Sequence, residues 1–371
     1  MTNQDTFHLL IQTNSPGELS CWVFPFIQVF KKKCPQSQVH LFLTPCQYAT
    51  GQEIIEAQNN ILIDKVYSPK ETIKHIFSLP FLKKIYTKGA VLCLGGDPIY
   101  TKLLGLKYRL PIYLYTEHSG YKPFFFKKVF YKQTDGDLMY ERIAQYQFDK
   151  KKVLTEYQLQ DKKYCLFLCG SRKQHFEKLL PFICDVVDKI KYKKPDFKAI
   201  LQISPFISEN DWEILKSRLD LSNFSVLRGN SLDLMSLSKL IVTLPSSANA
   251  EAMYLNKPML VLLPLNHPEL IILDGITGLI GNLPLLGKLL KKLIIFILKQ
   301  KKRLYSIPNR LAGKEIVPEI VDKIEVDDIA NRIIDLFYNE NELTKISQNL
   351  EKLPKSPEIA QKISNTLVHS A

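Results

Sequence analysis

The alternation of short apolar runs with helical patterns, which occurs twice along this chain, most constrains its fold. Strands that alternate with helices are typical of α/β proteins with a parallel sheet. The pattern begins again after the charged stretch 149–152. The chain is therefore predicted to form two Rossmann-like halves with a cleft between them. The predicted strands are 7–12, 39–43, 91–94, 112–115, 165–168, 199–203, 224–227, 240–243 and 259–263, and the predicted helices are 19–33, 70–87, 98–109, 175–193, 209–219, 247–256 and 327–338.

The amino-acid composition agrees with a two-domain α/β protein and limits the classes of molecule that the protein is expected to bind. The 371 residues, 46% hydrophobic and 23% charged, suffice for about two domains that each bury a core. Disordered, collagen-like and disulfide-scaffold proteins are excluded. The excess of 50 Lys and Arg over 37 Asp and Glu is typical of proteins that bind nucleic acid, anionic membranes or phosphorylated ligands. Because no nucleic-acid-binding motif or basic repeat occurs, nucleic acid is not an expected partner.

Cysteine usage and apolar run length predict a cytoplasmic protein. The seven cysteines form no CxxC pair and no zinc-ligand spacing, and several lie inside apolar strands, as reduced thiols do. Residues 1–5 carry no basic segment, and the apolar run that follows is too short for a signal peptide. The longest apolar stretch, 293–298, is far shorter than the roughly 20 residues that a membrane-spanning helix needs.

Two loops of the first half place carboxylates where a strand ends. In parallel sheets of this kind, ligands bind beyond the carboxyl ends of the strands. Segment 15–18 brings Glu18 there, either as a cleft carboxylate or as an acid that favours a helix N-terminus. In 95–98, Asp97 is either the N-cap of a helix with Pro98 at its first position, or a general base.

Two loops of the second half have the composition of phosphate sites. Gly170, Ser171 and Arg172 follow an apolar strand and precede a helix, so backbone N–H groups, a hydroxyl and a guanidinium can meet one phosphate. Segment 245–251 is small and polar, and in a nucleotide site it would hold a pyrophosphate while Glu251 binds ribose hydroxyls. The alternative for each loop is an ordinary capped helix.

These motifs together carry a family resemblance. The chain resembles the lipid-A-disaccharide synthase family, inverting glycosyltransferases of the GT-B fold. The matching segments run from residue 15 to about residue 320, and the most specific is the last. They are 17–18, 95–97, 136–139, 169–172, 245–251 and 307–319.

The resemblance implies an α/β protein of the GT-B fold, with two Rossmann-like domains and a central cleft. An acceptor-binding domain is expected at 1–155, a UDP-sugar-binding domain at 156–338, and C-terminal helices that cross back to the first domain at 339–371. The implied reaction transfers a diacylglucosamine unit from a UDP-sugar to a lipid-phosphate sugar acceptor with inversion, releasing UDP. The product would be a β-1,6-linked lipid A disaccharide. No metal or other cofactor is implied, and a homodimer stays open.

The resemblance also assigns roles to residues. Asp97 is the expected general base, and Glu18 is the second carboxylate assigned to catalysis. Gly17 is assigned to the acceptor side. His118, which lies in a segment that differs from the family, is also a candidate for the acceptor side, either as an acid-base pair with Glu117 or as a hydrogen-bonding residue of the loop. The residues assigned to the donor and its UDP are Gly170, Ser171, Arg172, Ser246, Ser247, Asn249, Glu251 and Asn309.

Departures from the family pattern concern mainly the acceptor. Residues 19–22 and 115–120 differ from the family, and Ser246 and Ser247 stand where it has glycine and threonine. Two alternatives therefore remain: a glycosyltransferase that makes a different glycolipid, and a non-catalytic glycolipid- or nucleotide-binding protein of this fold. The Asp-Gly-Asp sequence at 135–137 spells a metal motif of another glycosyltransferase fold, and it is not expected to bind metal here.

A basic, apolar segment predicts contact with an anionic membrane. Between Asp274 and Glu315 there are nine Lys and Arg and no acidic residue, and 285–302 interleaves lysines with aliphatic residues. Such a helix suits an anionic lipid surface, and the alternative is a core helix with a solvated face. Segments 79–84 and 121–128 repeat the pattern. The expected location is therefore peripheral, on the inner face of the cytoplasmic membrane.

Overall fold

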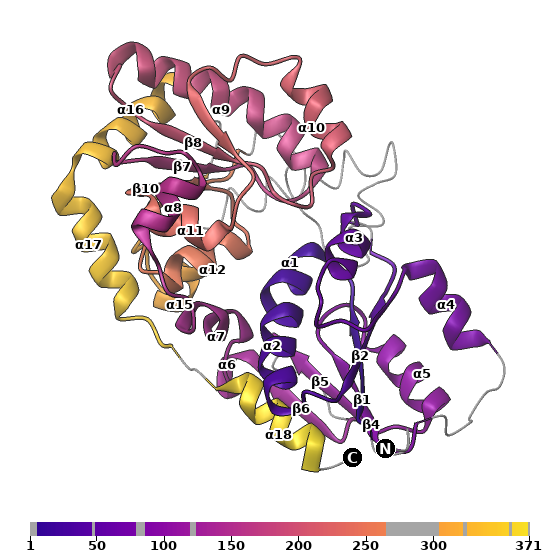
Figure 1. Cartoon of the computed structure of the whole chain (residues 1–371). Coiled ribbons are helices and arrows are strands. Elements are labelled where there is room, and N and C mark those ends of the chain that lie inside the picture. Colours follow the sequence, from indigo (N-terminus) through magenta and orange to yellow (C-terminus); the bar gives the residue numbers. More distant parts are fainter. Residues whose placement is uncertain are drawn as a thin grey trace, which may run out of the picture. The chain divides into compact units, whose positions relative to one another are not determined.

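The computed structural model describes residues 6–46, 49–78, 86–118, 124–264, 304–321, 325–355 and 358–369, except for the side chains of residues 174 and 175. The chain divides into two compact units. Unit 1 contains Met1–Tyr146 and Pro354–Ala371, and unit 2 contains Gln147–Leu353. Figure 1 shows the sheet and helices of each unit.

Unit 1 is built on a six-stranded parallel sheet in the order β3-β2-β1-β4-β5-β6. The central strands are buried over almost their whole length, as expected for a parallel sheet covered on both faces. The strands are β1 (His8–Thr13), β2 (Gln38–Leu43), β3 (Lys65–Tyr67), β4 (Gly89–Cys93), β5 (Ile112–Thr116) and β6 (Lys128–Tyr131).

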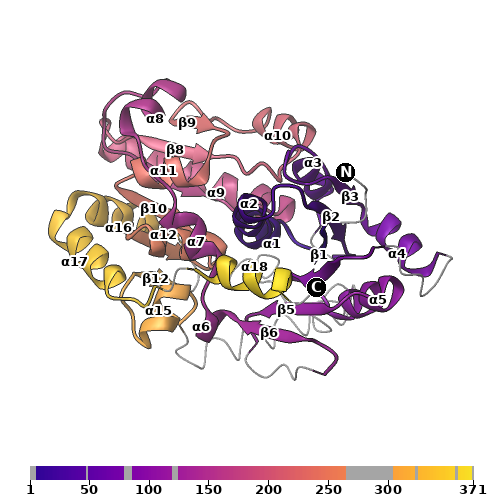
Figure 2. The same ribbon diagram turned by 60° about the horizontal axis from the view of Figure 1, so that its bottom comes forward.

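Helices cover both faces of this sheet, with α4 and α5 on one side and α2 and α18 on the other (Figures 1 and 2). The helices are α1 (Pro16–Glu18), the π-helical turn η1 (Leu19–Val23), α2 (Phe24–Lys33), α3 (Gln52–Gln58), α4 (Pro69–Phe77), α5 (Ile99–Tyr108), α6 (Lys132–Asp135), α7 (Leu138–Ala144) and α18 (Ile359–His369). The helix predicted at 70–87 ends at Phe77, since Pro80 disfavours helical geometry in the residue before it.

Unit 2 repeats the plan, with a parallel sheet in the order β12-β11-β10-β7-β8-β9. Its strands are β7 (Cys165–Leu168), β8 (Ala199–Gln202), β9 (Phe224–Leu227), β10 (Leu240–Thr243), β11 (Met259–Leu262) and β12 (Glu319–Ile320). Its helices are α8 (Lys150–Glu156), α9 (Lys173–Lys193), α10 (Glu209–Lys216), α11 (Ser231–Leu237), α12 (Ser247–Tyr254), α15 (Ile307–Ala312), α16 (Val326–Tyr338) and α17 (Glu340–Glu351). The predicted α/β class with two Rossmann-like domains is confirmed.

The unit boundaries differ in detail from the predicted domain boundaries. The chain enters unit 2 at Gln147, so α8 belongs to unit 2, whereas the predicted first domain extends to residue 155. The Tyr157 hydroxyl, just after α8, accepts the N–H of Asn230 in the loop after β9. Contacts assign α17 to unit 2 and α18 to unit 1, where Glu141 Oε2 accepts the N–H of Ala360 at 2.6 Å. The central cleft between the domains stays a prediction.

Two further predictions concern membranes. Among the described helices, none is both long enough and apolar enough to cross a bilayer. The segment 285–302, predicted to dock on anionic lipid, lies outside the described residues, as does 79–84.

Candidate functional site

Each sheet has one point at which the order of its strands reverses along the chain. In unit 1 this switch point lies between β1 and β4, and in unit 2 it lies between β7 and β10. Ligands of open α/β sheets bind beyond the carboxyl ends of the strands at such points. All four predicted strand-end loops follow one of these four strands. The structure therefore brings the predicted residues together in two pairs of loops, one pair in each unit.

In unit 1, the Glu18 carboxylate joins the two loops of the pair. Its Oε2 accepts the N–H of Ser15 at 3.2 Å, and its Oε1 accepts the N–H of Gly96, after β4, at 3.2 Å. The Ser15 hydroxyl accepts the N–H of Glu18 in return, which completes a capping box. Burial raises the pKa of Glu18 against the lowering effect of these hydrogen bonds. Glu18 therefore holds the glycine loop beside Asp97.

A buried amide that sequence reasoning missed supports the same loop. Gln12, at the end of β1, is fully buried. Its Nε2 donates to the Gly95 carbonyl at 2.6 Å, and its Oε1 accepts the Thr101 hydroxyl at 2.7 Å and the Cys93 thiol at 3.1 Å. A polar residue inside the apolar run 7–12 was the available signal. The network fixes the glycine loop from within the sheet.

Asp97 lies at the surface, directly before α5. Its Oδ1 accepts the N–H of Ile99 at 3.0 Å, as aspartates do in turns. The predicted N-cap, Asp97, lies one residue before the observed one, because Pro98 occupies the N-cap position and α5 begins at Ile99. The exposed carboxylate supports the start of α5 and also has access to solvent. A capping role and a role as base are thus compatible.

The predicted acceptor residues lie at the same end of unit 1. Gly17 is part of α1, and His118 is exposed just beyond β5. The neighbouring Glu117 accepts from Lys132 at 2.9 Å, and that ammonium lies 3.4 Å from Asp137 Oδ2. The two carboxylates are the main influences that raise the pKa of Lys132 against burial, which alone would lower it. The segment in which the chain departs from the family pattern is therefore tied to β6 and α6.

The Asp-Gly-Asp sequence uses its carboxylates inside unit 1. Asp135 Oδ2 accepts the N–H of Tyr131 at 2.8 Å, and its Oδ1 pairs with Lys362 of α18 at 2.5 Å. Asp137 caps α7, since its Oδ1 accepts the N–H of Met139 at 3.0 Å. Within the described ranges, no group of three or more His, Cys, Asp or Glu side chains could hold a metal ion.

In unit 2, the loop after β7 leads into the longest described helix. Gly170 has a φ of +96°, a conformation that favours glycine, and it turns the chain out of the strand. Ser171 and Arg172 are half-buried, and Arg172 is the N-cap residue of the 21-residue helix α9. The first N–H groups of α9 therefore lie beside the β7/β10 switch point, where they favour an anion.

The loop after β10 is closed by a capping box. The N–H of Ser246 donates to Asn249 Oδ1 at 3.2 Å, and Asn249 Nδ2 donates to the Leu244 carbonyl at 2.9 Å. Asn249 is fully buried, so its side chain shapes the loop from inside. Glu251 is also buried, whereas Ser247 is exposed at the start of α12. Of the four predicted residues, only Ser246 and Ser247 are not buried.

Asn309, in the most family-specific motif, is an internal hub. Its Nδ2 donates to the Val317 carbonyl at 2.8 Å and to Glu319 Oε1 at 2.6 Å. Its Oδ1 accepts the N–H groups of Ile316 at 2.7 Å and Val317 at 2.9 Å. These four bonds use the capacity of a side-chain amide, and Asn309 is fully buried. Every polar atom of the Asn309 side chain is engaged within the chain, which favours a supporting role, and direct contact with the donor stays a prediction.

Glu319 completes this motif and was not singled out from the sequence. Its Oε1 accepts the N–H of Ser306 at 2.8 Å and the Ser306 hydroxyl at 2.5 Å, and its Oε2 accepts the N–H of Tyr305 at 2.9 Å. The carboxylate thus joins β12 to the start of α15, which packs against α12. Its place at the end of the most specific family segment, 307–319, was the available signal in the sequence.

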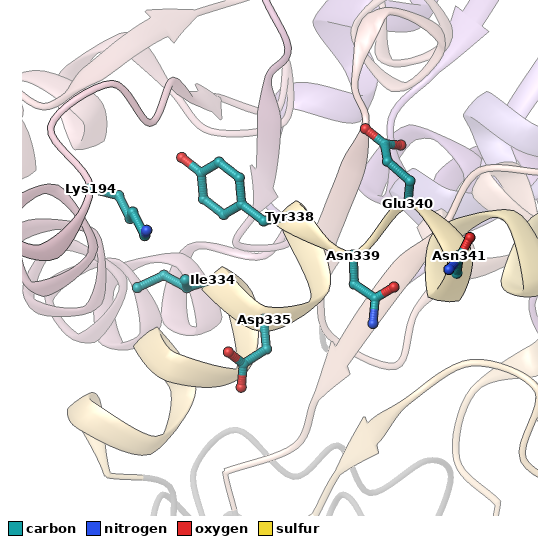
Figure 3. A pocket seen from close by; sticks show the side chains of 7 residues that line it. All are labelled: Lys194, Ile334, Asp335, Tyr338, Asn339, Glu340 and Asn341. Atoms are coloured by element: carbon teal, nitrogen blue, oxygen red, sulfur yellow. The ribbon is translucent and has the colours of Figure 1, made fainter.

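A separate pocket of about 550 Å³ lies at the far ends of α9 and α16 and contains none of the predicted residues. Figure 3 shows its lining side chains, Lys194, Ile334, Asp335, Tyr338, Asn339, Glu340 and Asn341. Lys163 and Lys239 pair with Glu340 at 2.6 and 2.9 Å and lower its pKa to about 2. Lys194 lies 5.4 Å above the Tyr338 ring. Glu340 and Lys194, two of the charged residues of this pocket, are therefore engaged in contacts within unit 2.

Comparison with known protein families gives one match. The sequence model described as lipid-A-disaccharide synthetase matches residues 121–367. Lipid-A-disaccharide synthase of Alteromonas mediterranea is 25% identical over 215 residues, covering 56% of this chain and 49% of that protein. Lipid-A-disaccharide synthase 2 of Legionella pneumophila strain Paris is 27% identical over 183 residues, covering 48% and 41%. The chain spans about half the length of the curated relatives it matches.

Similar solved structures cover the whole chain. A structure of S. aureus MnaA with UDP has a TM-score of 0.59 at 14% identity, covering 98% of this chain and 97% of that one. A putative UDP-N-acetylglucosamine 2-epimerase from Listeria monocytogenes has a TM-score of 0.54 at 11% identity, covering 98% and 96%. At these identities the similarity concerns the fold alone, and it agrees with the GT-B class.

Proposed function

This chain belongs to the lipid-A-disaccharide synthetase family, and on that basis we propose that it is a glycosyltransferase acting on a UDP-sugar. It transfers a diacylglucosamine unit to a lipid-phosphate sugar acceptor with inversion and releases UDP. The acceptor binds at the carboxyl edge of the sheet in unit 1, and the donor binds at the corresponding edge in unit 2. The protein works as a peripheral protein on the cytoplasmic face of an anionic membrane.

One observation carries the proposal. The loops at the switch point of unit 1 contain a carboxylate that could act as a base, and those at the switch point of unit 2 contain groups that could bind a diphosphate. At β1/β4, the Glu18 carboxylate holds the N–H of Gly96 next to the exposed Asp97. At β7/β10, Arg172 and the start of α9 lie beside the loop of Ser246 and Ser247. A carboxylate can accept a proton from a hydroxyl, and a guanidinium with free helix N–H groups suits a diphosphate. These are the two requirements of sugar transfer from a nucleoside diphosphate.

In the proposed reaction, Asp97 accepts the proton of the acceptor hydroxyl while that oxygen attacks the anomeric carbon of the donor. The new C–O bond forms on the face opposite to the diphosphate, and the bond between C1 and the diphosphate oxygen breaks. UDP leaves with the electron pair, and Arg172 and the N–H groups of α9 stabilise its developing charge. Glu18 is a positioning residue that acts through Gly96, and Asn249 and Asn309 shape the donor loops.

A glycosyltransferase for a different glycolipid is the second candidate. The pairing of Glu117 with Lys132, next to the exposed His118, favours it, because this segment departs from the family pattern at the acceptor side. Analysis of the lipids of a deletion strain separates the two candidates. Loss of the lipid A disaccharide supports the first, and loss of another glycolipid supports the second.

The direct test uses the purified full chain with UDP-2,3-diacylglucosamine and a diacylated glucosamine phosphate in detergent. Mass spectrometry of the product and measurement of released UDP give the readout, with Asp97→Asn as the matched inactive variant. A disaccharide that forms with the wild type and not with D97N supports the proposal. Binding of UDP without product from any lipid acceptor shows a non-catalytic binding protein.

A further inference from the structure

The helix α5 has apolar residues on two faces, and among the described residues only one of these faces is fully covered. Its inner face consists of the buried residues Thr101, Leu104, Gly105 and Tyr108, which pack on the sheet of unit 1. Its outer face carries Ile99, Leu103 and Leu106 at positions i, i+4 and i+7. Ile99 is 47% exposed and Leu106 is 57% exposed, whereas Leu103 is half-buried because it also packs against the core of unit 1. A helix that is apolar all round normally has a partner on both faces.

A second apolar feature adjoins this outer face. Phe124 and Phe125 are 75% and 76% exposed, and their rings lie 5.5 Å apart. Phe125 has a φ of +77°, which is an unfavourable backbone conformation for a bulky residue. The residue adopts this conformation although its ring is exposed to solvent. The next residue, Phe126, is buried in the core and anchors the segment.

Lys102 joins the two features into one surface. It lies on the outer face of α5, three residues after Ile99, and its Nζ is 5.5 Å from the ring centre of Phe125 and 5.6 Å from that of Phe126. The surface therefore runs from α5 across Lys102 to the two exposed phenylalanines. We call it the α5 surface, made of Ile99, Lys102, Leu103, Leu106, Phe124 and Phe125.

Apart from Asp97, which precedes α5, the charged side chains described in and next to the α5 surface are positive. Lys127 and Lys128 are exposed next to the phenylalanines, and Arg109 is exposed at the end of α5. Segments 99–109 and 124–128 contain no acidic residue. Basic residues near an anionic bilayer surface are attracted to it, and large apolar side chains can enter the boundary between headgroups and acyl chains.

We propose that the α5 surface docks on an anionic lipid bilayer. This deepens the proposed function, on which it rests, because it brings the loop of Asp97, directly before α5, to the lipid that carries the acceptor. A second copy of the chain fits less well, since two faces that both carry Lys102, Arg109 and Lys128 would repel each other.

The test measures flotation of the full chain with two kinds of vesicle, one of phosphatidylcholine alone and one of phosphatidylcholine mixed with the anionic lipid phosphatidylglycerol. The double variant Phe124→Ser/Phe125→Ser and the variant Leu106→Ser are compared with Ile61→Ser and Tyr192→Ser. These controls remove side chains that are 96% and 86% exposed and lie outside the α5 surface. All four variants replace only exposed side chains. Circular dichroism verifies that each variant is folded.

We expect the wild type to bind anionic vesicles at least tenfold more strongly than neutral ones, with binding that weakens as salt rises. The double Phe variant and L106S should lose binding by at least tenfold, and the two controls should retain it. Lys102→Gln combined with Lys128→Gln should remove most of the salt dependence. Equal flotation of the wild type and the double Phe variant would overturn the inference. It would also be overturned if substitution of the lysines within 285–302 abolished binding while the variants of the α5 surface still bound.

Two further readouts distinguish lipid docking from contact with a second copy and from a part in sugar transfer. If light scattering shows a dimer that the double Phe variant dissociates, the surface contacts a second copy and the inference is wrong. Transfer to an acceptor dispersed in detergent should be unchanged in the double Phe variant, because the proposed reacting groups lie elsewhere. If the wild type transfers no sugar but binds anionic vesicles through the α5 surface, the proposed function fails while this inference stands.

Discussion

The Glu18 side chain occupies the place that a side chain on residue 95 would need. A Cβ atom on Gly95 would stand 2.1 Å from Glu18 Cδ and 2.3 Å from its Oε2. Gly95 also has a φ of +114°, a conformation that L-residues rarely adopt. The loops of Glu18 and Gly95 are distant in the sequence but pack against each other. Residue 95 must be glycine because the Glu18 carboxylate occupies the space of any larger side chain.

Gly95→Ala should therefore destabilise unit 1 and move the Asp97 loop. Adopting the positive φ costs about 1–2 kcal/mol, and displacing the Glu18 carboxylate from its buried partners costs about 1–3 kcal/mol more. The measurement is urea unfolding of the full chain. The matched control is Gly51→Ala, since Gly51 has a φ of +86° and no atom within 4 Å of an added Cβ. G51A should show the first cost alone, and Glu18→Ala should relieve part of the effect of G95A.

Asp97→Asn should lower turnover by roughly 10²–10⁴-fold, the usual contribution of a general base. An asparagine still accepts the N–H of Ile99 through Oδ1, so the start of α5 and the stability of unit 1 should be retained. UDP affinity should also be retained, because the donor groups belong to unit 2. Steady-state kinetics with the detergent-dispersed acceptor decides this. A decrease of less than about tenfold would leave Asp97 with only its structural role.

Arg172→Ala should weaken UDP binding at least tenfold. A hydrogen bond to a charged group contributes about 1.5–3 kcal/mol, whereas a helix dipole contributes about 0.3–1 kcal/mol, so the side chain should dominate over the start of α9. Titration calorimetry with UDP gives the affinity. Arg228→Ala is the control, because Arg228 donates to the Ile207 carbonyl and pairs with Glu209. Equal losses in both variants would indicate a general effect of charge and exclude Arg172 from the site.

Much of this fold could be predicted because its core strands are continuous apolar runs. The strands that were missed, β3, β6 and β12, are short edge strands, and their pairing depends on neighbours distant in the sequence. Position at strand ends also located the site loops, since parallel strands share one carboxyl edge. Apolar runs and the positions of strand ends can both be read from a single sequence.

The roles of individual polar residues were harder to predict. Asn309 belongs to the most specific motif, but its partners are the backbone of Ile316 and Val317 and the carboxylate of Glu319. Motif strength does not distinguish a side chain that binds a ligand from one that builds the loop around it. Gln12 was missed for the related reason that its partners, Gly95 and Thr101, are distant in the sequence.

Asn309→Ala should destabilise unit 2 by about 3 kcal/mol or more. The change leaves two buried backbone N–H groups and the Val317 carbonyl without this partner, and each unsatisfied buried group costs about 1–3 kcal/mol. Urea unfolding gives the difference, with the exposed Asn331→Ala as control. At temperatures at which N309A is folded, its affinity for UDP should stay within about threefold of wild type. A large loss of UDP affinity with normal stability would return Asn309 to direct donor contact.

Two neighbouring imidazoles, the buried His40 and the half-buried His8, make the stability of unit 1 depend on pH. His8 Nδ1 and His40 Nε2 lie 3.2 Å apart, and both rings contact Tyr86. This hydrogen bond needs one nitrogen without a proton, so the two imidazoles cannot both be cationic. The nearest charged groups from the packed elements are Asp64, Lys65 and His75. Burial, together with His8 and Lys65, lowers the pKa of His40 to about 4, and burial also lowers that of His8.

A folded-state pKa below the unfolded value means that the unfolded chain binds more protons in acid. The contribution of His40 is therefore fully present above pH of about 6.5 and is lost as the pH falls toward about 4. Between pH 7.5 and 5.5 this amounts to about 1–2 kcal/mol. Hydrogen exchange of peptides from β1 and β2 should accelerate accordingly at pH 5.5, after correction for the intrinsic rate. His40→Phe, which keeps the ring and removes the proton site, should reduce this pH dependence, and the exposed His118→Phe should not. The same acceleration in H40F as in the wild type would show that other groups control the acid response.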